Sequence, residues 1–332
     1  AGKPASLGRQ AAPADGRLIM KTPRLAGQRA GIFPALLLCL SALPGPAMAE
    51  PRLAMPVDCT LGDTCFIQNY MDRDPGPGAQ DFTCAGLSYD THQGTDFALP
   101  TLSEMARGVT VRAAADGVVT GARDGMIDRR YTEAEDARID GRDCGNGVVL
   151  LHSDGWETQY CHLKQGSVQV RNGQMVRSGD ALGQIGLSGR TQFPHLHISV
   201  RRDGRVVDPF NTDEITECGQ DDGPEDDLWS DSPAYRPGGL VTIGASAGLP
   251  DYDAIKAGSV GVNGLTPDAP ALVGWGFAYG ARPGDTLDIA ITRPDGSELV
   301  SAAQEIEGRQ VLFFRAAGKR RPDNGWPVGD YE

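Results

Sequence analysis

The sequence has few basic residues for its length and no long uninterrupted apolar run. It contains 31 Lys and Arg against 44 Asp and Glu in 332 residues, and without residues 1–49 the balance is 25 against 43. This excess of negative charge argues against nucleic acid or an anionic membrane surface as the partner. The apolar stretch at 31–45 is too short and too interrupted by proline to predict a stable membrane span.

The sequence also lacks an amphipathic helical stripe of useful length. From about Val109, short apolar runs alternate with Asp-Gly and Asn-Gly turns, a pattern typical of antiparallel hairpins. A charged insertion at 125–144 predicts a helical turn on a surface loop. After residue 234, a second series of short strands predicts a small β-sandwich. The expected fold is therefore mainly β, an antiparallel β-sheet core followed by a small, Ig-like β-sandwich domain.

Composition predicts how the chain divides. Basic residues precede the apolar stretch, and Ala47-Met48-Ala49 resembles a cleavage site, so the first segment predicts a signal peptide behind an upstream extension. The sequence stops where a further strand is expected, so the last domain is predicted to be truncated. The predicted segments are the extension and signal peptide (1–49), a cysteine-containing segment (50–84), the main domain (85–218), an acidic linker (219–234) and the β-sandwich (235–332).

Cysteine usage fits an exported protein. Without the signal peptide six cysteines remain, an even number that predicts three disulfides with fifteen possible pairings. Two pairs are favoured. Cys59 and Cys65 would close a short loop, whereas Cys144 and Cys161 flank the two arms of a predicted hairpin. The remaining cysteines are Cys84 and Cys218.

The few histidines predict a metal site. His92 and Asp96 lie on either side of Gly94, and in a straight strand their side chains would be about 13 Å apart, too far to share one ion. A sharp bend at Gly94 would bring them together. His195 and His197 alternate along a predicted strand, so both rings project from one face. Together these residues offer a set of two histidines and one aspartate, with water completing the open coordination of a catalytic zinc site.

Not every histidine can be a ligand if one position stays open. His195 is better placed to reach a bound water than to coordinate, and His162 is a further candidate for the site. His152 follows a run of apolar residues and is more typical of a packed, hydrogen-bonded strand residue. The sequence has no HExxH motif, which excludes a glutamate base carried on a zinc-binding helix.

Four motifs, taken in order, carry a family resemblance: "HQGTD" (92–96), "GWETQYCHL" (155–163), "VRSGDALGQIGLSG" (176–189) and "PHLHISVRRDGRVVDP" (194–209). Over roughly 85–210 the chain resembles the LytM/lysostaphin-type zinc metallopeptidases, which cut peptide cross-links in bacterial cell walls. The resemblance implies an antiparallel β-sheet core with its site in a groove. It also implies one zinc ion held by His92, Asp96 and His197, with His195 and His162 as the catalytic pair, one as base and the other as oxyanion donor, in either assignment.

The function that the resemblance implies is an exported bacterial zinc endopeptidase, periplasmic or extracellular, that hydrolyses peptidoglycan stem peptides or cross-bridges through a zinc-activated water. Its partners would be peptidoglycan peptides, with no nucleic acid and no stable membrane insertion after signal cleavage. The alternative is a noncatalytic cell-wall-binding regulator with the same fold, and a weaker one is a zinc protease of soluble proteins. Phe193 departs from the family's usual glycine, and with Arg190 and Gln192 it is expected to border the groove and affect substrate preference.

Overall fold

The structure is a computed structural model that describes residues 50–213, 227–261 and 264–332. These residues belong to one compact unit, and the domain boundaries predicted within it stay predictions. The predicted signal peptide lies outside the described residues. Of the helices in the described ranges, none combines the length and the apolar character needed to cross a bilayer.

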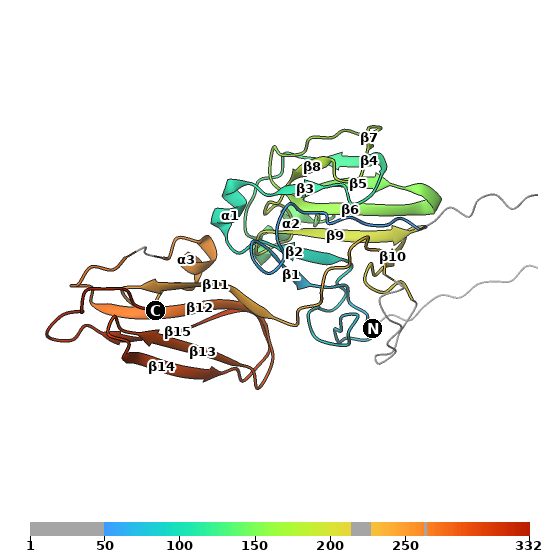
Figure 1. Cartoon of the computed structure of the whole chain (residues 1–332). Helices are drawn as coiled ribbons and strands as arrows, with labels where there is room; N and C mark the ends of the chain where they lie inside the picture. Colours follow the sequence, from blue (N-terminus) through green and yellow to red (C-terminus); the bar gives the residue numbers. More distant parts are fainter. Residues whose placement is uncertain (1–49, 214–226, 262–263) are drawn as a thin grey trace, which may run out of the picture. The chain divides into compact units, whose positions relative to one another are not determined.

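The first half of the described chain builds a large antiparallel sheet. Its strand order is β1-β2-β9-β6-β5-β4-β7, with β10 paired to β9, so β9 and β6 lie in the middle (Figure 1). A separate two-stranded sheet pairs β3 with β8. The predicted antiparallel, mainly β core is confirmed. The strands are β1 (Phe66–Asn69), β2 (Thr95–Ala98), β3 (Thr110–Arg112), β4 (Gly117–Arg123), β5 (Asn146–Leu151), β6 (Trp156–Leu163), β7 (Met175–Val176), β8 (Ala181–Gln184), β9 (His195–Arg202) and β10 (Arg205–Val207).

The described helices are all short, as the absence of a helical stripe predicts. Asp251 caps one of them, since its side chain accepts a hydrogen bond from the Ala254 N–H, which satisfies one of the free donors at a helix start. Two lie within the charged insertion at 125–144, where a helical turn was expected. The helices are α1 (Leu102–Arg107), α2 (Asp136–Ile139), α3 (Tyr252–Ala257), and the 3₁₀ turns η1 (Glu133–Glu135) and η2 (Ser153–Gly155).

Side chains alternate along β9, so one face of the large sheet packs in the core and the other face carries two histidines. Leu196, Ile198 and Val200 are buried in the hydrophobic core. Because successive strand residues point to opposite faces, His195 and His197 project from the other side, as predicted. The buried side chains of β9 hold the strand in place, and the strand in turn fixes the positions of both imidazoles.

The second half of the described chain forms two further antiparallel sheets, β11-β12-β15 and β13-β14. Leu272 of β12, Ile291 of β13 and Leu299 of β14 pack in one cluster, so side chains of both sheets share a core. This agrees with a small β-sandwich, and its Ig-like character stays a prediction. The strands are β11 (Gly239–Ser246), β12 (Ala271–Ala281), β13 (Thr286–Thr292), β14 (Glu298–Glu305) and β15 (Gln310–Arg320).

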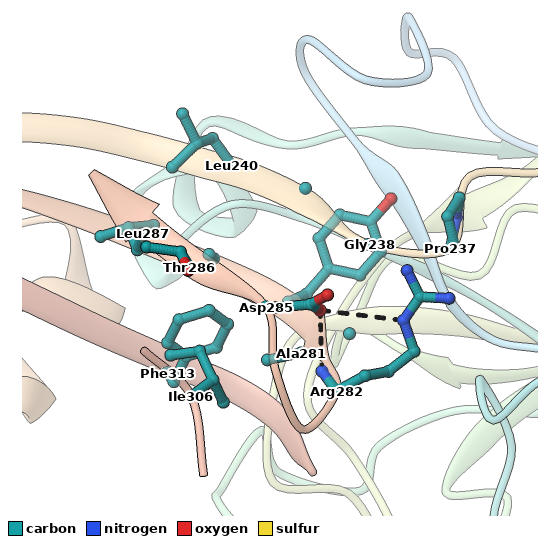
Figure 2. Close-up of a pocket in the computed structure, with 14 residues that line it drawn as sticks. Pro237, Gly238, Leu240, Ala281, Arg282, Asp285, Thr286, Leu287, Ile306 and Phe313 are labelled. Atoms are coloured by element: carbon teal, nitrogen blue, oxygen red, sulfur yellow. Dashed lines mark hydrogen bonds and ion pairs between the residues drawn. The ribbon is translucent and has the colours of Figure 1, made fainter. Parts of the chain in front are cut away.

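A cavity of about 300 Å³ opens between these two sheets (Figure 2). Leu240, Leu287 and Phe313 supply apolar wall. On one side the backbone N–H of Arg282 donates to Asp285 at 2.9 Å. The cavity is lined by none of the residues predicted to bind metal.

Two disulfides are present in the described residues. Cys59 is bonded to Cys65 and Cys144 to Cys161, so both favoured pairs are confirmed. A third pair would have to join Cys84 to Cys218. It stays a prediction, because Cys218 lies outside the described residues.

Candidate metal centre

Gly94 forms the bend that the spacing of His92 and Asp96 demands. The chain bends at Gly94 and enters β2 at the next residue, which places Asp96 inside the strand and His92 before it. A Cβ atom at position 94 would lie 2.7 Å from the His197 ring and 2.5 Å from the Ile198 carbonyl oxygen. Only glycine fits this close approach, and the predicted bend is confirmed.

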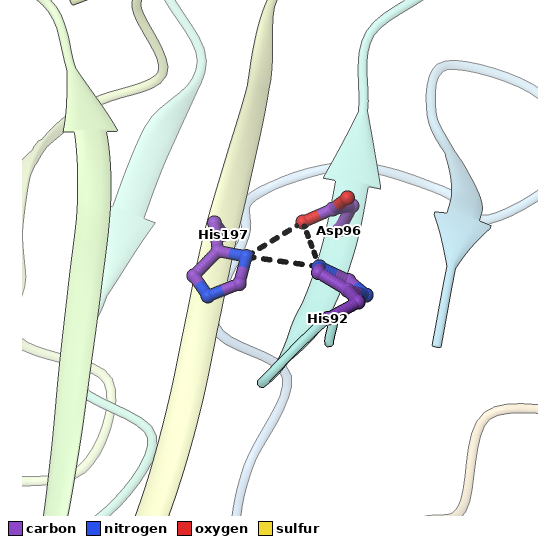
Figure 3. Close-up of side chains that lie close together, drawn as sticks. All are labelled: His92, Asp96 and His197. Carbon is purple, nitrogen blue, oxygen red and sulfur yellow. Dashed lines mark hydrogen bonds and ion pairs between the residues drawn. The ribbon is translucent and has the colours of Figure 1, made fainter. Parts of the chain in front are cut away.

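Three donor atoms from segments remote in the sequence converge beside this bend. Asp96 Oδ1 lies 3.1 Å from His92 Nε2 and 2.9 Å from His197 Nδ1. The two ring nitrogens are themselves 3.1 Å apart, and Figure 3 shows the three side chains facing one another. Antiparallel pairing of β2 with β9 sets Asp96 directly opposite His197. The structure thus brings together the residues predicted as metal ligands.

Hydrogen bonds behind the rings determine which nitrogens carry protons. His92 Nδ1 donates to the Tyr70 carbonyl oxygen at 2.7 Å, so in the neutral ring Nε2 keeps its lone pair. Ser199 donates its hydroxyl proton to the Gln93 carbonyl oxygen at 2.6 Å. Its oxygen therefore accepts from His197 Nε2 at 3.0 Å, which leaves the lone pair of His197 on Nδ1.

These donors fit a divalent metal ion. When both rings are neutral, two imidazole lone pairs and the Asp96 carboxylate oxygen crowd together, an arrangement that a cation relieves. Asn69 Nδ2 donates to the other Asp96 oxygen at 2.9 Å, so Oδ1 is held toward the rings. Ligand atoms of tetrahedral zinc lie about 3.3 Å apart, close to the separations here, and outer hydrogen bonds of this kind orient metal ligands.

Electrostatics favour the ionised carboxylate. Burial alone would raise the pKa of Asp96, but His92 and His195 hold it well below its usual range. Burial would likewise lower the pKa of His92, yet Asp96 and the bond to Tyr70 raise it. Burial lowers the pKa of His197. Without metal, His92 is therefore the ligand on which a proton competes best with a cation.

His195 and His162 flank the three ligands, as predicted for the catalytic pair. Their ring centroids are 4.7 Å apart, and His195 Nε2 lies 3.5 Å from Asp96 Oδ1. His195 Nδ1 donates to the Phe193 carbonyl oxygen at 2.8 Å. His162 Nδ1 donates to the Ser188 carbonyl oxygen at 2.8 Å. In both neutral rings Nε2 is consequently the unprotonated nitrogen.

Both ring nitrogens of His152 form hydrogen bonds within the protein, as expected of a packed residue. Its Nδ1 donates to the Asp116 carbonyl oxygen at 2.7 Å, and its Nε2 lies 2.8 Å from the Thr158 hydroxyl. Tyr160, on the strand of His162, is fully buried in the core and its oxygen accepts from the Ala114 N–H. Both side chains are therefore part of the packed interior and not of the metal site.

The three residues expected to border the groove differ in burial and in their contacts. Phe193 is buried, and its carbonyl oxygen orients His195. Arg190 forms ion pairs with Asp136 and Asp143, which ties the loop before β9 to the insertion at 125–144. Gln192 is exposed.

Sequence reasoning missed the groups that orient the ligands. Ser199 had a signal, since it follows His197 by two residues and shares its strand face. Asn69 and Tyr70 had none, because they reach the site from β1 and the residue after it, more than twenty positions before the first ligand.

Comparison with known proteins shows what the segment around this site is similar to. Residues 90–209 match the model of peptidase family M23. The DD-carboxypeptidase/endopeptidase Mpg of Neisseria meningitidis is 35% identical over 133 residues, 38% of this chain and 25% of that protein. The peptidoglycan DD-endopeptidase ShyA of Vibrio cholerae is 34% identical over 116 residues, 35% of this chain and 21% of that protein.

This chain thus spans about a quarter of the length of these curated relatives. Among solved structures, the catalytic domain of lysostaphin from Staphylococcus simulans is 22% identical, with a TM-score of 0.28, over 42% of this chain and 85% of that domain. All five predicted site residues lie within residues 90–209, the range that matches the family model.

Proposed function

From the premise that residues 90–209 form a peptidase family M23 domain, we propose that this protein is a zinc endopeptidase that hydrolyses peptide bonds in peptidoglycan. The relatives named as DD-endopeptidases make the DD bond of cross-linked stem peptides the first candidate. One observation carries the proposal. His92, Asp96 and His197 turn three potential ligand atoms toward one point, and two further histidines lie beside them.

The metal ligands would be His92 Nε2, Asp96 Oδ1 and His197 Nδ1. A zinc ion held there supplies Lewis-acid chemistry and lowers the pKa of a coordinated water to about 7. Three protein ligands leave a position open for that water, which is typical of catalytic rather than structural sites.

His195 and His162 would handle the protons. In each neutral ring Nε2 is unprotonated because Nδ1 is tied to a carbonyl oxygen, and both rings lie beside the ligands. The ring that accepts the water's proton becomes a donor and can return the proton to the leaving amine, while the other ring can stabilise the developing oxyanion once its Nε2 carries a proton. An imidazole suits this exchange because its ordinary pKa lies near neutral pH.

We further propose export to the periplasm or cell surface. Support comes from the signal peptide predicted in residues 1–49 and from two disulfides, which persist in oxidising compartments. The cell-wall substrate lies in the same place.

Digestion of purified peptidoglycan sacculi tests the function. Zinc-loaded protein should release muropeptides whose masses identify a cleaved stem-peptide cross-link, whereas an unfolded soluble protein should be cut poorly. The His195→Ala variant is the control, since it keeps the three ligands. Full zinc occupancy without release of any muropeptide would instead support a noncatalytic cell-wall-binding regulator.

A further inference from the structure

His162 reaches the site only because β6 is irregular at this residue. Along β6, Thr158 and Tyr160 are fully buried in the core, and so is Leu163. With regular alternation His162 would face the core like Tyr160. Instead its φ is 62°, a left-handed conformation that a residue with a side chain seldom adopts. The ring lies beside the metal ligands instead, with its centroid 6.1 Å from that of the His197 ring.

The irregularity is a β-bulge between β5 and β6. Asn146 pairs with Leu163 and Val148 pairs with Tyr160, so Gly147 alone stands opposite both Cys161 and His162. A Cβ atom at Gly147 would lie 2.5 Å from the Tyr160 carbonyl oxygen and 2.8 Å from Cys144 Sγ. Bulges re-aim side chains, often beside active sites.

A disulfide closes over this bulge. Cys161 immediately precedes His162 and is bonded to Cys144, which precedes β5 by two residues. The His162 N–H donates to the Cys144 carbonyl oxygen at 2.8 Å. The two ends of the disulfide are thus the residue before His162 and the acceptor of its backbone hydrogen bond.

The ring of His162 is held from a second side. Gly186 donates its N–H to the His162 carbonyl oxygen at 3.0 Å, and the Ser188 carbonyl oxygen accepts from Nδ1. A left-handed conformation of a residue other than glycine is unfavourable and persists only where the surrounding structure enforces it. The disulfide supplies the covalent part of that enforcement.

We infer that the Cys144–Cys161 disulfide is a positioning element for catalysis, which locks the bulge of β6 so that His162 Nε2 faces the metal ligands. The inference rests on the proposed function. The disulfide is expected to affect the position of His162 but not metal binding, because the three ligands do not depend on this bond. Formation of the disulfide after export would therefore complete the catalytic pair.

The test replaces each disulfide by alanines in the full chain. C144A/C161A should keep bound zinc and a similar KM on a cross-linked muropeptide, with kcat lowered about 100-fold, the loss typical of a small misplacement of a catalytic group. The matched control is C59A/C65A, which removes the other disulfide and should keep kcat. Equal kcat in wild type and C144A/C161A would overturn the inference.

A double-mutant comparison separates positioning from general stabilisation. If the disulfide acts through His162, then C144A/C161A should cause no further loss of kcat in a His162→Ala background. A further 100-fold loss in that background would show that the disulfide acts on other groups and would overturn the inference.

Amide exchange supplies a readout that does not depend on catalysis. In wild type the His162 amide should exchange slowly, and in C144A/C161A it should exchange at least tenfold faster, while the Ile198 amide of β9 keeps its protection. If C144A/C161A does not fold, a phosphine can reduce the native disulfide, with each phosphine taking oxygen from one water as two thiols form. Unchanged His162 protection would contradict the inference, whereas faster exchange in a protein that cleaves no muropeptide would contradict only the peptidase function.

Discussion

His92 Nε2 lies 3.1 Å from His197 Nδ1, although the two residues are 105 positions apart. Neither nitrogen carries a proton when its ring is neutral. The proton of His92 is on Nδ1, which donates to the Tyr70 carbonyl oxygen, and the proton of His197 is on Nε2, which donates to the Ser199 hydroxyl oxygen. Two facing lone pairs repel each other and the nearby carboxylate repels both, so a positive charge between them stabilises the pair. A metal ion, or a proton on His92 in the metal-free site, would supply that charge.

Removal of one ligand ring should release the metal. In His197→Ala, two of three donors remain, so bound zinc should fall from stoichiometric to negligible and muropeptide cleavage should be lost with it. Metal analysis after dialysis measures the first and a sacculus digest the second. His152→Ala is the contrasting variant. It removes the partner of the Asp116 carbonyl oxygen and one of the two partners of the Thr158 hydroxyl, which keeps its contact with Tyr160, so it should keep zinc and lose about 1–3 kcal/mol of stability. Retained zinc in His197→Ala would refute the ligand assignment.

Ser199 should matter through the tautomer of His197. Ser199→Ala removes the acceptor for Nε2–H, so the ring can rotate or move its proton to the nitrogen that should coordinate. Loss of such an outer contact lowers metal affinity roughly 10–100-fold. Competition with a zinc chelator measures the affinity. Ser301→Ala, at an exposed position of β14, should leave it unchanged, and an equal affinity in both variants would remove Ser199 from the site.

Zinc binding should displace one proton near neutral pH. The pKa of His92 is raised in the metal-free site, that of His197 is lowered by burial and that of Asp96 lies well below its usual range. As pH falls through the raised pKa of His92, this ring gains a proton and only this ligand is blocked. Apparent affinity should then fall about tenfold per pH unit. Titration calorimetry in buffers of different ionisation enthalpy counts the protons, and release of two would contradict the assignment.

The raised pKa of His92 also predicts how the stability of the metal-free protein changes with pH. A group whose pKa is raised by folding stabilises the folded protein below its unfolded pKa and loses that contribution as pH rises through the folded pKa. Metal-free protein should therefore lose the contribution of His92 as pH rises above the ordinary histidine value. Chemical unfolding of the metal-free protein across pH 6–9 measures it.

Local sequence patterns were sufficient to predict that the candidate ligands come together, although their role as ligands stays a prediction. The interval between His92 and Asp96 with a glycine inside it predicts a bend, and the alternation of His195 and His197 predicts a shared strand face. Both follow from chain geometry within five residues. The hairpin pattern likewise predicts an antiparallel sheet, because Asp-Gly and Asn-Gly turns allow little else between short apolar runs.

The orientation of His162 could not be predicted in this way. Its position in β6 predicts a side chain in the core, and the bulge that turns it outward depends on Gly147 of the neighbouring strand and on pairing of Cys144. The role of Asn69 depends on the register of β1 against β2. Such contacts arise from pairing between strands, which no single segment specifies.

Gly94 should tolerate no side chain. Gly94→Ala would place its Cβ against the His197 ring and the Ile198 carbonyl oxygen, at 2.7 and 2.5 Å, so the bend must open and His92 must leave the other ligands. Zinc affinity should drop at least tenfold, and thermal unfolding should occur at a lower temperature. Gly248→Ala is the matched control, because a Cβ there has no atom within 4 Å. Similar zinc affinity in both variants would contradict the close packing at Gly94.

His162 should act on turnover without holding the metal. His162→Ala should keep stoichiometric zinc, since Nε2 of this ring is not among the three converging donors, and should lose roughly 2–4 kcal/mol of transition-state stabilisation. That corresponds to about 30- to 900-fold in kcat/KM. Alanine is strained at a φ of 62°, so part of its effect is on the backbone. His162→Gly removes the same ring and relieves that strain. If the ring carries the function, both variants should be equally slow while the glycine variant is the more stable. A glycine variant with near wild-type turnover would show that His162 takes no part in proton transfer or oxyanion stabilisation.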